Sequence, residues 1–148
     1  MAAVDRNDAT DPHHLQRFVA AQEPVFGAVL EELARGAKRS HWMWFVFPQL
    51  AGLGRTATAQ HYGITSAVEA LAYWRHPLLG ARLKECTALV FAVEGKSALQ
   101  ILGAPDDLKF RSSMTLFERV APEARVFDRA LDKYFGGDRD AATLALLR

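Results

Sequence analysis

Hydrophobic residues recur along the chain at steps of three and four, and proline or glycine separates the runs. The first run is Leu15, Phe18 and Val19 with Gln22 on the same face, and the second, after Pro24, is Phe26, Val29, Leu30 and Leu33. This spacing places apolar side chains on one face of a helix. Asp11 and Pro12 supply a capping side chain and a first-turn proline, and Gly36 ends the second run. The pattern predicts two short helices or one kinked helix.

Residues 42–47 are apolar on every side, so periodicity does not distinguish a buried strand from a buried helical turn. A lone strand would leave unpaired backbone groups at its edges, and no second strand is evident. We therefore interpret the segment as helical, ended by Pro48. Residues 52–56 then form a predicted loop, in which Thr56 caps a short helix through Tyr62.

The clearest amphipathic helix comes in the second half of the chain. Its apolar residues step by four, three, four and three: Leu79, Leu83, Cys86, Val90 and Val93. Before it, Ser66 and Glu69 have the spacing of a capping box, and that helix should end by Arg75 because Pro77 disfavours helical geometry at the preceding residue. Gly95 ends the amphipathic helix.

Further helices are predicted from a capping residue or a first-turn proline, at Ser97, Pro105, Pro122 and Asp138. The first has Gln100 at capping-box spacing, and the second should run to Val120. The pattern as a whole predicts an all-α fold, a compact single domain of six to eight short helices. We expect residues 12–148 to form this domain and residues 1–11 to form a flexible N-terminal tail.

Composition narrows the class of protein without naming a reaction. Half of the 148 residues are hydrophobic, and a chain of this length can bury roughly 70% of its unfolded surface, enough for one core. The net charge of +1 does not favour a nucleic-acid partner. One cysteine forms no intramolecular disulfide, and no segment has the roughly 20 apolar residues of a membrane span. We expect a cytoplasmic protein with no membrane partner; the sequence does not indicate its oligomeric state.

Residues 52–57 match the dinucleotide-binding pattern G-x-G-x-x-[G/A]. A Rossmann unit needs a clean strand before this loop and a second parallel strand after it, and neither is evident here. A smaller role stays open, in which backbone N–H groups near Gly54, helped by Arg55, hold one phosphate or carboxylate. The alternative is an ordinary two-glycine turn with a solvated Arg55.

Basic residues are followed closely by aromatic residues just before Pro48. Lys38, Arg39 and His41 precede Trp42 and Trp44, and Gln49 follows the proline. Such a mixture can stack a base or sugar beneath an anion-binding rim. Rings this close together more often belong to a core, and cations after a helix often complement its dipole.

A second polar segment, residues 106–115, combines carboxylates, cations and hydroxyls. On a helix, Asp106, Lys109 and Ser113 share one face, and Asp107, Arg111 and Thr115 share a neighbouring one; Ser112 is the third hydroxyl residue of the segment. A carboxylate beside a cation and hydroxyls could serve as a general base. In the alternative interpretation, the carboxylates complement the helix dipole and Asp107 pairs with Arg111.

Metal, nucleophile and cofactor chemistry find no support in the sequence. The histidines, His13, His14, His41, His61 and His76, show no metal-binding spacing, and Cys86 lies on the apolar stripe. The sequence contains neither the G-x-S-x-G nucleophile elbow of serine hydrolases nor the lysine motif of a phosphate-binding P-loop. We expect no metal and no cofactor.

Four segments carry a resemblance to a known family: residues 38–50, which begin KRSHWMWF, and residues 52–54, 76–80 and 106–117. They resemble the bacterial domain of unknown function 1810 family, sometimes labelled calpastatin-like. The resemblance implies a compact, mostly helical domain and carries no established activity, cofactor or catalytic residue. Calpastatins are disordered, whereas this composition requires a packed core, so we set that label aside.

The leading hypothesis is a cleft for a small anionic ligand, nucleotide- or sugar-phosphate-like, with hydrolysis or group transfer as the further step. The acid–base candidates are His41 and Asp107, and the ligand-binding candidates are Lys38, Arg39, Trp42, Trp44, Gln49, Gly54, Arg55, Lys109, Ser112 and Ser113. The alternative is a non-catalytic protein-interaction module. Full burial of Trp42 and Trp44, with no cleft joining the three segments, would favour the alternative.

Overall fold

The computed structural model describes residues 10–148, and over these residues it contains ten α-helices and no strand. The α-helices are α1 (Gln16–Gln22), α2 (Phe26–Ala34), α3 (Met43–Val46), α4 (Ala57–His61), α5 (Ala67–Arg75), α6 (Pro77–Ala92), α7 (Ala98–Leu102), α8 (Asp106–Val120), α9 (Val126–Phe135) and α10 (Ala141–Leu146), and the 3-10 helices are η1 (Ala51–Leu53) and η2 (Pro122–Ala124). The predicted all-α single domain is confirmed, and six of its helices have seven or more residues. Apart from Thr10 and Asp11, the predicted tail lies outside the described residues.

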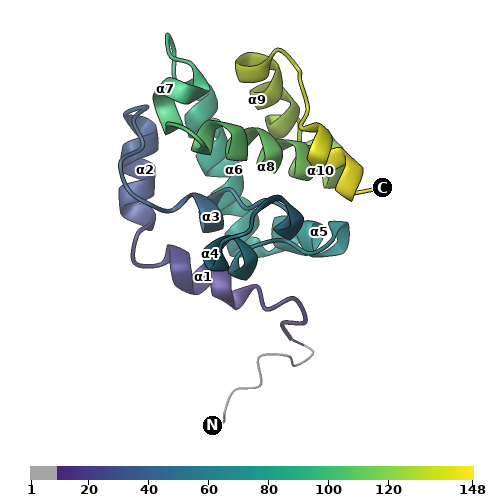
Figure 1. Cartoon of the computed structure of the whole chain (residues 1–148). Coiled ribbons are helices and arrows are strands. Elements are labelled where there is room, and N and C mark those ends of the chain that lie inside the picture. Colours follow the sequence, from purple (N-terminus) through teal and green to yellow (C-terminus); the bar gives the residue numbers. More distant parts are fainter. Residues whose placement is uncertain (1–9) are drawn as a thin grey trace.

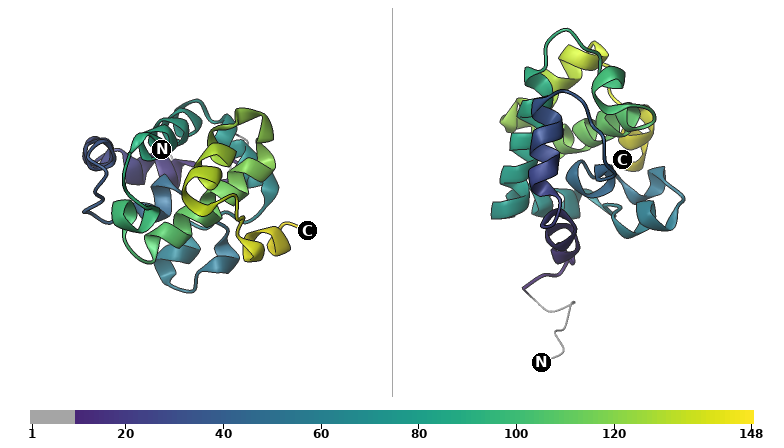
Figure 2. Two further views of the ribbon diagram at one scale, coloured as in Figure 1. Left: turned by 90° about the horizontal axis from the view of Figure 1, so that it is seen from above. Right: turned by 90° about the vertical axis from the view of Figure 1, so that its left-hand side faces the viewer.

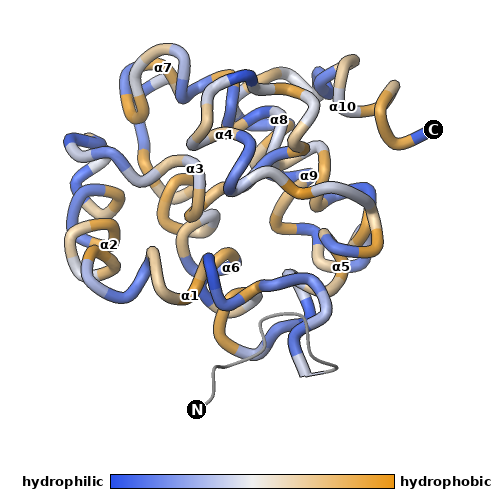
Figure 3. Tube along the Cα trace, turned by 60° about the horizontal axis from the view of Figure 1, so that its bottom comes forward, coloured by the Kyte–Doolittle hydropathy of each residue, from blue (hydrophilic) through white to orange (hydrophobic). Residues whose placement is uncertain are grey.

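Helix α8 runs across the middle of the molecule and contacts α5, α7, α9 and α10 (Figure 1). Helix α6 packs against α2, α5 and α9. The right-hand view of Figure 2 agrees with Figure 1 in placing α1 at one end of the domain and α7 and α9 at the other. In Figure 3 the colour of α2 changes within single turns, as expected of a helix with one buried face.

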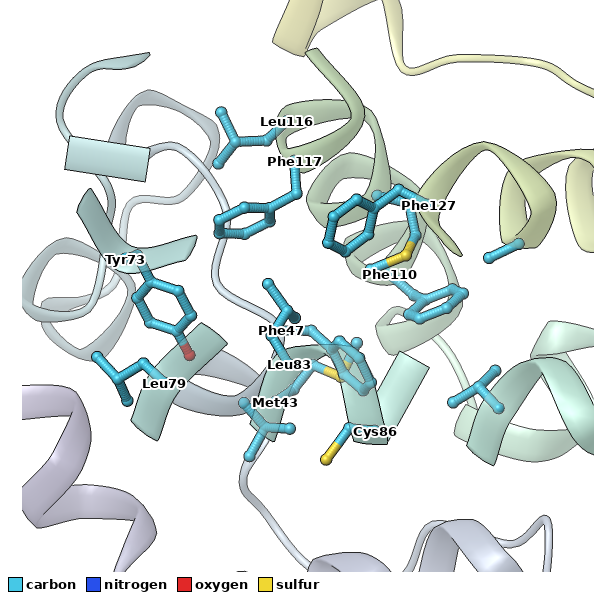
Figure 4. Close-up of a cluster of buried hydrophobic side chains, with 14 of the residues drawn as sticks. Met43, Phe47, Tyr73, Leu79, Leu83, Cys86, Phe110, Leu116, Phe117 and Phe127 are labelled. Carbon is cyan, nitrogen blue, oxygen red and sulfur yellow. The ribbon is translucent and has the colours of Figure 1, made fainter. Parts of the chain in front are cut away.

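The side chain of Phe47, just after α3, meets aromatic side chains from α5, α8 and α9 in the core (Figure 4). The rings of Phe47 and Phe110 lie edge to face with centroids 5.0 Å apart, and those of Phe117 and Phe127 are 5.8 Å apart. Cys86 is fully buried, as its place on the apolar stripe predicts. Burial raises the pKa of its thiol to about 12, so it carries no reactive thiolate.

Several helix starts form as the capping residues predict. Ser97 and Gln100 make both bonds of a capping box, and the Thr56 hydroxyl accepts from the Ala59 N–H. Ser66 accepts from the Glu69 N–H, but the Glu69 carboxylate turns instead to Thr65 and Arg17.

Two helix starts near the C-terminus differ from the prediction. Pro122 opens a 3-10 turn, and Arg125, with a φ of 62°, separates it from α9. The last helix begins at Ala141 and is capped by Asp140, whose carboxylate accepts from the Thr143 N–H, whereas Asp138 lies two residues too early and pairs with Arg111. Both differences come from tertiary contacts and backbone geometry that local spacing does not encode.

Candidate functional site

A recess of about 360 Å³ lies between the α2–α3 connection and the start of α8. Its lining residues are Lys38, Arg39, His41, Met43, Trp44, Leu102, Ala104, Pro105, Asp106 and Lys109. Figures 1 and 2 show the α2–α3 connection passing beside α7 and the first turn of α8. The Lys38 N–H donates to the Ile101 carbonyl at 2.8 Å, which joins the two walls.

The α2–α3 connection folds around the carboxylate of Glu32. This carboxylate accepts from the N–H groups of Arg39 at 2.9 Å and Ser40 at 3.1 Å, from the Ser40 hydroxyl at 2.6 Å and from the Trp42 indole N–H at 2.9 Å. Burial alone would raise the pKa of Glu32, but these four bonds outweigh it and lower the pKa to about 2. Trp42 is thereby drawn into the core, while the side chains of Arg39 and His41 stay exposed.

We expect Glu32 to make part of the stability depend on acid pH. Its pKa is lowered from 4.5 to about 2 on folding, so its contribution is complete above pH 4.5 and disappears as the pH falls towards 2. This shift corresponds to about 3 kcal/mol. Urea unfolding between about pH 5 and pH 2.5 should show a steeper loss for the wild type than for Glu32→Gln. Equal pH slopes for the two proteins would contradict this role.

A buried ion pair forms the inner wall of the recess. Lys38 Nζ lies 2.8 Å from Asp106 Oδ2, and the two side chains are 7% and 19% exposed. The same ammonium donates to the Ser40 carbonyl at 2.6 Å and lies 4.9 Å from the ring centre of Trp42. Lys38 is therefore fully engaged with the protein.

The outer wall is formed by Trp44 and Lys109. Lys109 Nζ lies 4.9 Å from the ring centre of Trp44, which is half-buried. On the other side of this pair, a narrow slot of about 10 Å³ is lined partly by Gln49 and Tyr62. Exposed Arg39 and His41 complete the rim of the recess.

The structure brings together five of the predicted site residues: Lys38, Arg39, His41, Trp44 and Lys109. Gln49 lines the adjoining slot with Trp44 and Lys109. The recess thus joins two of the three segments considered in the sequence, and of the two tryptophans only Trp42 is fully buried.

The other predicted residues do not line the recess. Gly54, Arg55 and Asp107 lie outside its wall. Trp42 is buried, and its N–H is taken by Glu32. These residues were predicted because they lie within or beside the motifs in the sequence. Position in the sequence does not determine where a residue lies relative to the recess or which way its side chain points.

The predicted row of hydroxyls on α8 faces inwards. Ser112 and Ser113 are buried, and the Ser112 hydroxyl donates to the Leu108 carbonyl one turn back. Arg111 pairs with Asp138 at 3.1 Å and Asp140 at 3.6 Å rather than with Asp107. Arg111 therefore holds the C-terminal segment, whereas the hydroxyl of Ser113 is buried without a hydrogen-bond partner among residues 10–148.

The sequence analysis missed Glu32, which shapes the α2–α3 connection without lining the recess, and it did not include Asp106 among the ligand-binding candidates. Glu32 occupies a position between Val29 and Leu33 on the buried side of α2. A carboxylate on the apolar face of a helix must be hydrogen-bonded when it is buried. The position of Glu32 among apolar residues was therefore the sequence signal that could have identified it.

Within residues 10–148, no cluster of three or more histidine, cysteine, aspartate or glutamate side chains is placed to hold a metal ion. None of the helices in that range combines the length and the hydrophobicity needed to cross a membrane.

A family model described as "Protein of unknown function (DUF1810)" matches residues 12–147. The chain belongs to the DUF1810 family. It is also similar to a solved structure, the conserved hypothetical protein Rv1873 from Mycobacterium tuberculosis, with 57% sequence identity and a TM-score of 0.92. The match covers 93% of this DUF1810 chain and 98% of that one. No curated protein matches the chain. Neither description names an activity, so function has to be argued from the recess.

Proposed function

We propose that the recess binds a small anionic metabolite, nucleotide- or sugar-phosphate-like. The observation that carries the proposal is the convergence of Arg39, His41 and Lys109 on one cavity of about 360 Å³ beside the half-buried ring of Trp44. This volume lies within the usual range of small-molecule sites, roughly 300–1,000 Å³. An aromatic face next to cations suits a sugar or base that carries a phosphate.

The local charge of the recess favours an anionic ligand more strongly than the net charge of the whole chain does. Lys38 and Asp106 neutralise each other, which leaves Arg39 and Lys109 as the unbalanced charges of the lining. The chain as a whole carries a formal net charge of only +1. The excess positive charge is therefore local, as recognition of a small anion requires.

Of the two acid–base candidates, only His41 lines the recess. An imidazole at this rim is placed to exchange a proton with a bound phosphate ester, which is the arrangement that hydrolysis or group transfer would use. The proposal itself concerns binding.

Thermal unfolding with added ligand tests the proposal. Ribose 5-phosphate or adenosine monophosphate at ten times its dissociation constant should raise the Tm of the wild type by roughly 4 °C. The double variant Arg39→Ala/Lys109→Ala should lose most of this shift, because both unbalanced cations are gone. Arg55→Ala is the matched control, since it removes an exposed cation outside the recess and should leave the shift unchanged.

Two results would overturn the proposal. One is the absence of any Tm shift at millimolar ligand. The other is a shift of equal size in the wild type and in the double variant.

A further inference from the structure

We infer that Asp106 determines which anion the recess accepts, by favouring a phosphate ester of a polyhydroxylated group over a simple phosphate. The phosphate then lies at the rim near Arg39 and Lys109, and hydroxyl groups point inwards to the Asp106 carboxylate. This inference rests on the proposed function and concerns the same recess. It adds an orientation and a specificity-determining residue.

The first step concerns the cation at the inner wall. The Lys38 ammonium contacts Asp106 Oδ2, the Ser40 carbonyl and the face of the Trp42 ring. Two of its three protons are directed at these two oxygens, and the side chain, which is only 7% exposed, also lies over the Trp42 ring. Lys38 is therefore not free to bind a phosphate, and the anion has to use the cations of the rim.

The second step concerns the start of α8, where helix N–H groups often bind phosphate. Here three N–H groups at this end are already bonded: Asp107 donates to the Gly103 carbonyl at 2.9 Å, and Leu108 and Lys109 donate to the Pro105 carbonyl at 3.0 and 3.1 Å. The first turn also carries the carboxylates of Asp106 and Asp107. A phosphate at this end would meet negative charge and bonded amides.

The third step concerns what the Asp106 carboxylate offers to a ligand. A carboxylate has about four acceptor positions, and Lys38 binds at Oδ2. Asp106 lines the recess and is partly exposed, so its remaining positions are within reach of a ligand. Hydroxyl groups donate strong, charge-assisted hydrogen bonds to such oxygens, whereas a bare anion is repelled.

The volume of the recess limits the size of the ligand. At about 360 Å³ it lies near the lower end of the range for ligand sites. A single sugar phosphate or nucleoside monophosphate suits this space, and its ring can lie against Trp44. Sugar phosphates and nucleoside monophosphates share the chemistry that Asp106 would select, which is a phosphate ester with adjacent hydroxyls.

Titration with ribose 5-phosphate and with ethyl phosphate tests the inference, because the two esters carry the same phosphate group and differ in their hydroxyls. The wild type should bind ribose 5-phosphate at least about tenfold more tightly. In Asp106→Asn the preference should fall to about threefold or less, while ethyl phosphate binds equally or more tightly because a negative charge has been removed. Adenosine monophosphate in place of ribose 5-phosphate shows whether a base adds to the affinity.

Thermal unfolding without ligand shows whether Asp106→Asn is folded. If it is not, Lys38→Met/Asp106→Asn removes both members of the buried pair and should give the same reduced preference.

The outcomes separate this inference from the proposed function. If the wild type binds the two esters equally, or if Asp106→Asn weakens both equally, Asp106 does not determine specificity. Anion binding by the cations of the rim would still stand. If neither ester binds, the proposed function and this inference fall together.

Discussion

Replacing Gly80 with alanine is expected to lower the free energy of unfolding by about 3 kcal/mol, although alanine is the better helix former. The reason is the sharp turn between α5 and α6, where a Cβ at Gly80 would overlap the carbonyl oxygen of Trp74 and lie 3.0 Å from its carbonyl carbon. Both atoms belong to the backbone, so they cannot rotate away. The overlap outweighs the gain of about 1 kcal/mol in helix propensity.

Gly27→Ala provides a matched control in another helix. Gly27 is an exposed residue of α2, and a Cβ there would meet nothing within 4 Å. Alanine at this position should raise the free energy of unfolding by up to about 1 kcal/mol. Urea denaturation of the two variants should therefore show changes of opposite sign. A Gly80→Ala protein as stable as the wild type would contradict the close approach of α5 and α6.

Arg17→Ala is expected to cost about 3–5 kcal/mol, because it leaves a buried carboxylate without its partner. Arg17 Nη2 lies 2.7 Å from Glu69 Oε2, and the two side chains are only 10% and 4% exposed. The same guanidinium donates to four backbone carbonyls, of His13, His14, His61 and Gly63. It thus joins α1 to α4, to α5 and to the segment between them.

Arg35→Ala is the matched control for this prediction. Arg35 pairs with Glu31 at 3.7 Å on the surface, where the two side chains are 61% and 68% exposed. Its loss should change the free energy of unfolding by no more than about 0.5 kcal/mol. Chemical denaturation that gave similar small changes for both variants would show that the Arg17–Glu69 pair is not a structural anchor.

Local sequence signals predicted most of the helices because those signals act over three or four residues. The Ser97–Gln100 capping box and the Thr56 cap form as expected, since each needs only its own turn. The prediction was wrong at Asp138: α10 begins at Ala141 and is capped by Asp140, and Arg111, distant in sequence, lies near both carboxylates, 3.1 Å from Asp138 and 3.6 Å from Asp140. Partners of this kind depend on the tertiary fold and cannot be read from spacing.

The candidate site was predictable in its composition but not in its geometry. The mixture of basic and aromatic residues before Pro48 identified Arg39 and Trp44, and the polar segment at residues 106–115 identified Lys109. What places them together is the hydrogen bond between Lys38 and Ile101, a contact across more than sixty residues. The loop at residues 52–56 has an equally suggestive sequence, yet it does not line the recess.

The most direct test of anion binding at this recess is a titration of the ¹⁵N-labelled protein with ribose 5-phosphate, followed by amide chemical shifts. The account predicts the largest shift changes at residues 39–44 and 104–109, with residues 52–56 unaffected. The double variant Arg39→Ala/Lys109→Ala should lose these shift changes, because it lacks the two cations that are proposed to bind the phosphate. An absence of shift changes at millimolar ligand, or changes confined to residues 52–56, would contradict the account.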